Sequence, residues 1–475
     1  MRKPLAVLGL LGMTLMACSQ AGTDATDPLN GDGAAAQTSG QVDARGNQFP
    51  PAPIAPDGDL DPAVADAVTR LVESADTGLD LEALEVVAGS ADPRLTWLVA
   101  DLLRFLQIGQ VGDALQSAFS ALTGLDLASD PAASESPWRA VTDHLIAWDL
   151  PAPPGYADMK QELFLLVEPR WAPFFSDENA AIDWRWVSWG GVYIDDRPLG
   201  ETGFCERGCI PGLDDPALTD ADGGDWYSDG YVVFGTVVDG EAIALPKNMM
   251  EVHEMVNITI GGRRLGIPYC TLCGSAQAYF LDRNPNWNEP IVLRTSGLLA
   301  RSNKVMYDLN TMSVFDTFTG IALSGPLHDA GVELEQNTVV GSTWGDWKLQ
   351  HPDTMIVAQD GGIGRRYEED PLQGRDAAGP IFPVGEVDPR LAAQTLVVGV
   401  ISPAGEPLAF PLEAARSAVA EGEDVAFNGV RLVSDGSGFR AEAPTGVEVV
   451  AHQAFWFAWS QFHPGTMVWD VANSE

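Results

Sequence analysis

The chain has 475 residues, of which 67 are Asp or Glu and 27 are Lys or Arg, so its formal net charge at pH 7 is −40. A single hydrophobic core rarely serves a chain of this length, so we expect two or three domains. A negative field of this size repels nucleic acid and anionic lipid surfaces, which argues against nucleic-acid binding. We interpret the acidic residues as a solvated surface rather than as a dedicated cation site.

Residues 1–18 have the form of a bacterial lipoprotein signal peptide. Arg2 and Lys3 precede a short apolar run, and the sequence Leu-Met-Ala-Cys closes it at Cys18. The run is too short to span a membrane and is typical of an export signal. The closing residues resemble a lipobox, which implies a lipid on Cys18 and an extracytoplasmic protein anchored to the cell envelope, at the outer membrane if the source has two membranes. A plain secretory signal is the alternative.

The next two segments differ sharply in composition. Residues 19–60 consist mostly of small and polar residues, which predicts a disordered linker. Helical spacing then begins, and DPRLTWLVADLLRFL follows an Asp-Pro start signal with Leu on one face. We therefore predict a helical module over residues 61–150 that resembles a HEAT-like helical pair. We expect it to pack as its own module, to be separable from the rest, and to offer a surface to a protein partner.

From residue 151 to residue 475 the pattern changes to short alternating apolar runs broken by turn residues. This pattern predicts a mainly antiparallel β domain, so the expected fold class is α+β. The stretches TWGDWKLQHPDTM and FWFAWSQFHPGTM share Trp, Trp, His, Pro, Thr and Met, each pair 112 positions apart. Because GEAIALP and GGRRL are echoed in the same order by GEPLAFP and NGVRL, we predict an internal duplication with repeat units at about 229–357 and 394–469.

The residues best suited to chemistry lie in the first repeat, which carries a long insert that the second lacks. Cys270 and Cys273 form a Cys-x-x-Cys pair there, which is able to hold a soft metal, to form a redox-active disulfide or to staple a turn. His253, Met306 and His351 would add imidazole and thioether donors, a set that suits cuprous copper better than zinc. We expect at least one of these three to reach the sulfurs. A core role is the alternative for Met306, and a packing role for His351.

A second pair, Cys205 and Cys209, is spaced Cys-x-x-x-Cys. It would complete a four-sulfur zinc site if it met the first pair, but an exported protein more often uses such a pair as a disulfide, which we favour. His253 and Glu254 lack the second histidine of a metalloprotease helix. Serine hydrolase, P-loop and dinucleotide-binding signatures are not evident.

Three separated stretches carry a family resemblance: VVFGTVVDGEAIALPKNMMEVHEMVNITIGGRRLGIPYCTLCGSAQAYF, RTSGLLARSNKVMYD and TWGDWKLQHPDTMIV. In order and spacing they resemble the bacterial family catalogued as domain of unknown function 3179, from about Trp184 to Val357 and onward to Trp469. That family has no assigned activity. Ile258 departs from its pattern, which has Asp there. The residues that match its signature are His253, Glu254, Asn257, Cys270, Cys273, Gly274, Ser296, Gly297, Ser302, Asn303, Met306, Tyr307, Asp308, Trp344, Trp347, His351 and Pro352.

Three hypotheses for function follow. The leading one is a lipid-anchored extracytoplasmic protein that binds or handles copper through Cys270 and Cys273. An enzymatic alternative uses the same cysteines for thiol–disulfide exchange. The third is a non-catalytic envelope interaction protein whose cysteines form structural disulfides.

Overall fold

The computed structural model describes residues 41–203, 205–375 and 379–473. The predicted signal peptide, its lipidation site Cys18 and residues 19–40 of the predicted linker lie outside the described residues. Residues 41–60 are not a free linker, because they lie against the folded chain. The Gln41 amide donates to the Ala147 carbonyl at 2.6 Å, and the Trp148 indole donates to the Pro50 carbonyl at 2.7 Å.

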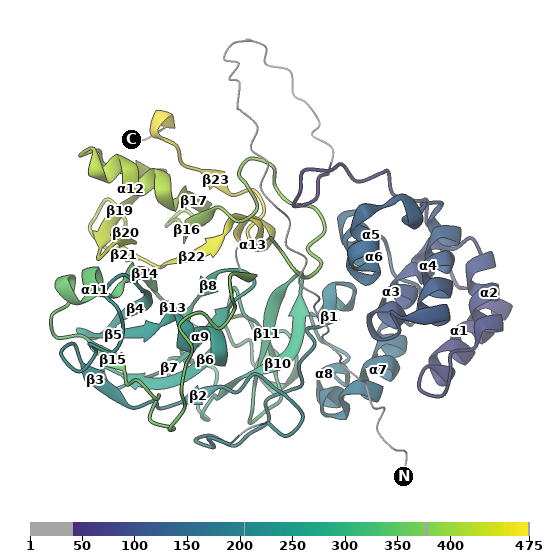
Figure 1. Ribbon diagram of the computed structural model, residues 1–475, viewed down its shortest axis with the longest axis horizontal. Helices are drawn as coiled ribbons and strands as arrows, with labels where there is room; N and C mark the ends of the chain where they lie inside the picture. The colour runs from purple at the N-terminus through teal and green to yellow at the C-terminus, as the bar shows by residue number, and fades with distance from the viewer. Residues whose placement is uncertain (1–40, 204, 376–378, 474–475) are drawn as a thin grey trace.

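The N-terminal part is helical and occupies the right side of Figure 1. Its helices are α1 (Pro62–Ser74), α2 (Leu81–Gly89), α3 (Thr96–Phe105), α4 (Gly109–Thr123), α5 (Pro131–Glu135), α6 (Pro137–Ala147), α7 (Tyr156–Val167) and α8 (Ala172–Phe175). Asp61 caps α1 by accepting from the Ala63 N–H at 2.9 Å. The helices continue beyond the predicted boundary at residue 150, since Tyr156, Leu163 and Val167 of α7 keep buried positions at helical spacing. In the part of the chain that the structure describes, no helix is both long and apolar enough to cross a membrane.

The helical region does not pack as a separate module, contrary to our expectation. Its buried residues form one continuous hydrophobic cluster with residues of the first sheet. The Trp171 indole donates to the Ser296 carbonyl at 2.8 Å, and the rings of Phe174 and Tyr307 lie 5.3 Å apart. Removing the helices would expose these apolar side chains and leave a buried carbonyl without its donor, so the helices stabilise the β region.

The β region contains five small sheets in the described residues, arranged in the propeller-like ring at the left of Figure 1. The first sheet has the order β1 (Val187–Trp189), β10 (Leu293–Ala300), β11 (Asn303–Asp308), β12 (Val314–Asp316). The second has the order β13 (Gln336–Asn337), β9 (Ala278–Phe280), β7 (Arg263–Cys270), β6 (Met255–Ile260), β2 (Leu213–Asp214), and β8 (Ser275–Ala276) pairs with β7.

The other three sheets include the strands that the two predicted repeat units share. They have the orders β14 (Val340–Thr343), β4 (Val232–Val238), β5 (Glu241–Pro246), β15 (Met355–Val357), β3 (Leu218–Asp220); β22 (Ala451–Phe455), β16 (Leu396–Ile401), β17 (Pro407–Pro411), β23 (Met467–Val468); and β18 (Ala426–Phe427), β19 (Val430–Asp435), β20 (Gly438–Glu442), β21 (Glu448–Val449). The helices among the strands are α9 (Lys247–His253), α10 (Gly325–Asp329), α11 (Trp344–Gln350), α12 (Leu412–Ala420) and α13 (Trp456–Phe462). Most strand pairs are antiparallel, as the α+β prediction requires.

The two repeat units share topology and register. The order β14-β4-β5-β15 matches β22-β16-β17-β23, and in each unit the last pair is parallel while the others are antiparallel. Gly235 pairs with Ala244 in one unit, and Gly399 pairs with Ala409 at the equivalent position in the other. Matching registers across separate strand pairs support the predicted duplication.

The repeated Trp-His motifs serve this shared architecture. The rings of Trp347 and His351 lie 4.1 Å apart, and those of Trp459 and His463 lie 4.2 Å apart. Each histidine ends its helix with its N–H bonded to the carbonyl of the paired tryptophan, at 2.8 and 2.9 Å. The duplicated histidines are therefore packing and helix-ending residues.

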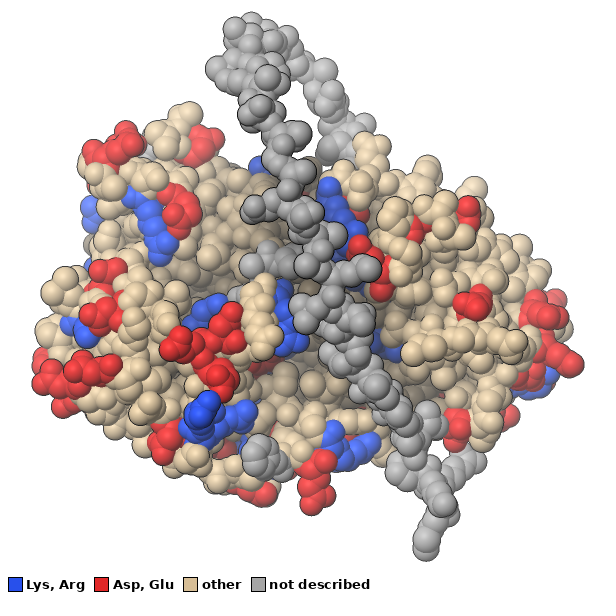
Figure 2. All heavy atoms as spheres, viewed as in Figure 1, with Lys and Arg blue, Asp and Glu red and all other residues tan. Residues whose placement is uncertain are grey.

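Acidic side chains are dispersed over the visible face of the molecule, with Lys and Arg between them, in Figure 2. Many form surface ion pairs, such as Arg45 with Glu135 at 2.6 Å. This distribution is that of the solvated acidic surface predicted from composition.

We expect Gly235→Ala and Gly399→Ala each to lower the free energy of unfolding by about 1–3 kcal/mol, because a new methyl group would overpack a filled core. A Cβ at Gly235 would lie 2.5 Å from the Trp347 ring, and one at Gly399 would overlap the Trp459 ring. Gly89→Ala is the matched control, since a Cβ there meets nothing within 4 Å. Urea unfolding measures the effect. Wild-type stability in both core variants would show that the tryptophans do not pack on these glycines.

Candidate functional site

Cys270 and Cys273 lie at the turn that joins β7 to β8. Cys270 ends β7, and the Cys273 N–H donates to the Cys270 carbonyl at 3.2 Å to close the turn. Gly274 follows with a φ of +59°, a conformation that glycine adopts without cost. A Cβ at Gly274 would also lie 2.9 Å from the ring of Phe455. Both cysteines are free thiols, with 1 % and 0 % of their surface exposed.

A second turn places polar groups against the two sulfurs. Arg301 and Ser302 join β10 to β11 with φ values of +47° and +70°, so they form a tight two-residue hairpin. The Ser302 carbonyl lies 3.8 Å from the Cys270 Sγ and 3.7 Å from the Cys273 Sγ. The Asn303 Oδ1 lies 3.6 Å from the Cys273 Sγ. These oxygens are acceptors for a thiol proton.

The two thiols differ in acidity. Burial alone raises the pKa of Cys270, but the Cys273 thiol and the backbone N–H groups of Lys304 and Cys273 donate to its sulfur, and the pKa falls below the ordinary thiol value. Burial raises the pKa of Cys273 well above that value, and its donated hydrogen bond and the neighbouring negative charges raise it further. Of the two thiols, Cys270 therefore loses its proton more readily, and Cys273 keeps its proton.

Cys270 also lines a pocket of about 190 Å³. The polar part of the wall near the sulfur comes from Glu254, Thr271 and Lys304, while Cys273 does not line the pocket. The rest of the wall is mostly apolar and comes from Val192, Ile210, Leu272, Leu298, Leu299, Ile381 and Phe382. A ligand in this pocket would meet Cys270 beside a mostly apolar wall, to which Arg375 adds a positive charge.

Glu254 and Lys304 form a buried acid–base pair beside the thiols. The Lys304 ammonium contacts the Glu254 backbone carbonyl and lies 3.8 Å from the Glu254 Oε2. The Thr271 hydroxyl donates to the Glu254 Oε1 at 2.9 Å. Burial raises the pKa of Glu254 and lowers the pKa of Lys304. The raised pKa makes the Glu254 carboxylate a stronger base than an exposed one.

His253 does not turn toward the sulfurs. Its Nδ1 donates to the Pro211 carbonyl at 2.6 Å, and its Nε2 accepts from the Tyr367 hydroxyl at 2.7 Å, so both ring nitrogens are engaged. Burial lowers the pKa of His253 to about 4, which keeps the ring neutral. The imidazole is therefore a structural bridge between two segments.

Met306 and His351 do not join the thiols either. Met306 is fully buried in a cluster with Tyr279 and Phe315, while Cys270 and Cys273 belong to a different cluster. The His351 Nε2 is bonded to the Asp435 Oδ1 at 2.6 Å, which links the two repeat units. The structure thus places the predicted third metal ligands at three other sites.

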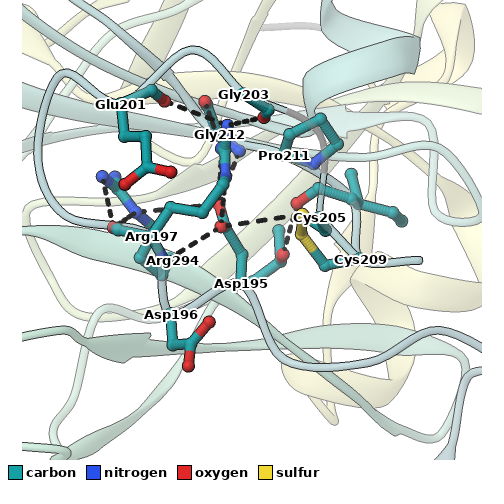
Figure 3. The surroundings of a disulfide bond; sticks show 12 residues. Asp195, Asp196, Arg197, Glu201, Gly203, Cys205, Cys209, Pro211, Gly212 and Arg294 are labelled. Carbon is teal, nitrogen blue, oxygen red and sulfur yellow. Dashed lines mark hydrogen bonds and ion pairs between the residues drawn. A yellow bond between two sulfur atoms is a disulfide. The ribbon is translucent and has the colours of Figure 1, made fainter. Parts of the chain in front are cut away.

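The prediction of a disulfide between Cys205 and Cys209 is confirmed, with a Cα–Cα distance of 5.4 Å (Figure 3). Asp195 lies beside it, with its Oδ1 4.0 Å from the Cys205 Sγ and 2.6 Å from the Arg197 Nε. Metal ions in proteins are usually held by the side chains of Asp, Glu, His and Cys. Among the described residues, one group of three such side chains has its ligand atoms near enough to share a metal, and it consists of Asp195, Cys205 and Cys209. Because the two sulfurs are bonded to each other, they are not free thiolate ligands, and the alternative of a four-sulfur site with Cys270 is wrong.

Lys304 was not predicted from the sequence as a residue of the site. The sequence signal was present, since the strand NKVMYD is buried at every position in the structure and a lysine in such a strand requires a partner. Its partner Glu254 follows α9 and lies 50 positions away in the sequence, so local spacing gives no sign of the pair.

One comparison with known proteins gives a match that covers this site. A family model described as "Protein of unknown function (DUF3179)" matches residues 207–443. The chain belongs to this family. The DUF3179 match includes the thiol turn, the Glu254–Lys304 pair and most of both repeat units, and helices α1–α8 lie outside it. No curated protein and no solved structure matches the chain.

We expect Cys270 to react with iodoacetamide with a pH midpoint below about 8.5, the value for an unperturbed thiol. Cys273→Ala should raise that midpoint, because it removes the thiol that donates to the Cys270 sulfur. Peptide mass spectrometry of protein labelled across a pH series measures the rate at each cysteine, and urea-unfolded protein is the control. Equal midpoints for Cys270 in wild type, Cys273→Ala and unfolded protein would contradict the assignment of the thiolate.

Proposed function

We propose that the protein is a thiol–disulfide oxidoreductase whose reactive dithiol is Cys270 and Cys273. One observation carries the proposal: the thiol with the lowered pKa lines a pocket, and the thiol with the raised pKa lies buried behind it. A nucleophile must be ionised and reachable, whereas a resolving thiol must stay protonated until the first step is complete.

The reaction proceeds by two exchanges. The Cys270 thiolate attacks one sulfur of a substrate disulfide, forms a bond to it and releases the other sulfur as a thiolate that takes a proton from water. Cys273 then loses its proton and attacks the Cys270 Sγ, which releases the second substrate sulfur as a thiol. Two electrons have passed from the protein to the substrate, and a Cys270–Cys273 disulfide remains. A dithiol partner regenerates the reduced pair by the reverse exchanges.

Glu254 acts in the second exchange as the base that takes the proton of Cys273. Its raised pKa and its place in the same pocket wall support this role, and the Thr271 hydroxyl orients the carboxylate. Lys304 offsets the charge of Glu254 and holds its backbone carbonyl. The pair thereby keeps a base available inside an apolar pocket.

Copper handling, the leading hypothesis from the sequence, receives less support. Two sulfurs still offer soft donors, but His253 and His351 are hydrogen-bonded elsewhere and Met306 lies in another cluster. A dithiol needs only Cys270 and Cys273, whereas the copper site needed converging imidazole or thioether groups.

Exchange with bis(2-hydroxyethyl) disulfide tests the proposal. The reduced protein should reduce this compound, Cys270→Ser should abolish the reaction, and Cys273→Ser should accumulate a mixed disulfide on Cys270 that mass spectrometry identifies. The double variant Cys205→Ser, Cys209→Ser is the matched control and should retain exchange. Glu254→Gln should slow the release of the second substrate thiol. Undiminished exchange in Cys270→Ser would refute the proposal. The metal hypothesis would be favoured if the wild-type protein showed no exchange activity, bound copper tightly, and lost that binding in Cys270→Ser.

We also propose that the protein works outside the cytoplasm, held to the envelope by a lipid on Cys18. The Cys205–Cys209 disulfide supports an oxidising compartment. Cys18→Ser should release the protein from membranes, as measured by fractionation, and the N-terminal peptide of the native protein should carry a diacylglycerol mass. A native N-terminal peptide without lipid would exclude the anchor.

A further inference from the structure

A second pocket, of about 460 Å³, lies away from the thiols. Its wall comes from the turn before β4, from α9 and from the segment 359–369. It shares no lining residue with the pocket of Cys270. Its volume falls in the range of sites that hold small molecules.

Aromatic rings form one side of this pocket. Trp226 and Tyr227 have ring centroids 5.2 Å apart, and Tyr227 and Tyr231 have centroids 5.5 Å apart. The Tyr227 hydroxyl is held by the Val232 carbonyl at 2.7 Å, so the middle ring is fixed. Tyr231 is 39 % exposed, which leaves part of its ring open to a ligand. Three adjacent rings with one fixed in place make a firm apolar wall.

Polar groups on the same pocket lack partners. Asn248 is only 5 % exposed, and its Nδ2 donates to the Glu368 carbonyl at 2.9 Å. Its Oδ1 and the Nε1 of Trp226 are both buried without a hydrogen-bond partner in the part of the chain that the structure describes. A buried polar atom left unpaired costs about 1–3 kcal/mol. A ligand that carries both a donor and an acceptor would be able to pair with these two atoms after a small movement of the Asn248 and Trp226 side chains.

Charged groups of both signs complete the wall. Arg365 and Arg366 line it together with Asp360 and Glu369. The Glu369 Oε2 accepts from the Tyr231 hydroxyl at 2.9 Å, so this carboxylate also orients an aromatic ring. The two arginines and the two carboxylates balance in formal charge, so the wall itself has no net charge to attract an anion. The wall therefore favours a ligand without net negative charge.

We propose that this pocket binds a neutral or N-acetylated saccharide. The faces of a sugar ring present C–H groups that lie on an aromatic wall, and its hydroxyls both donate and accept hydrogen bonds. Hydroxyls would satisfy the Asn248 Oδ1 and the Trp226 Nε1, and the arginines and carboxylates would bond the remaining ones. This binding is independent of the thiol chemistry, because it uses other residues in another pocket.

Titration with cellobiose, maltose and N,N′-diacetylchitobiose tests the proposal, with tryptophan fluorescence and saturation-transfer NMR as readouts. At least one of these disaccharides should bind. Tyr231→Ala, which changes a partly exposed side chain, should weaken binding about tenfold, the loss that corresponds to the upper range of a stacking contact. Asn248→Leu removes the buried acceptor and should weaken binding as well.

Two controls separate the possible results. Leu349→Ala changes a side chain that is 81 % exposed and does not line this pocket, and it should bind as wild type does. Cys270→Ser should also bind normally, so a failed thiol assay and a failed sugar assay are distinguishable. The proposal is overturned if none of the three disaccharides binds at millimolar concentration, if Tyr231→Ala and Asn248→Leu both bind as tightly as wild type, or if ATP binds in this pocket and the sugars do not.

Discussion

The β region depends on the packing of a helix tryptophan on a strand glycine. Trp347 lies on Gly235 and Trp459 lies on Gly399, and both indoles are buried. A side chain at either glycine would push the helix off its sheet, so these positions set the distance between the two. Because the same contact occurs at the same register in both units, both units depend on it for their packing.

The second unit has a further task, which is to hold the cysteine turn of the first. The Phe455 N–H donates to the Cys273 carbonyl at 2.8 Å, and the Phe455 ring occupies the space beside Gly274. The turn is thus fixed from outside its own unit. A copy without cysteines is still required to position the cysteines of its partner copy, which explains why the duplication needs both halves although only one carries thiols.

Sequence patterns predicted the features that depend on local spacing. The duplication was predicted from Trp and His at a constant offset, and the Cys205–Cys209 disulfide from short spacing together with a predicted export signal. The surroundings of His253 depend on distant segments, since its Nε2 partner Tyr367 lies 114 positions further along the chain. Periodicity carries no information about such contacts. The prediction that the His253 imidazole lies near the cysteines depended only on their proximity in the sequence.

The bond from the Trp171 indole to the Ser296 carbonyl has a consequence for the evolution of the family. The family match begins after this tryptophan, yet the carbonyl that it satisfies belongs to a residue inside the match and directly before Gly297, which lines the thiol pocket. A relative without the short turn Pro169–Trp171 would leave this carbonyl exposed or unpaired. In such a relative, an indole, amide or hydroxyl from a different extension would have to donate to this carbonyl, since a buried carbonyl without a donor is costly.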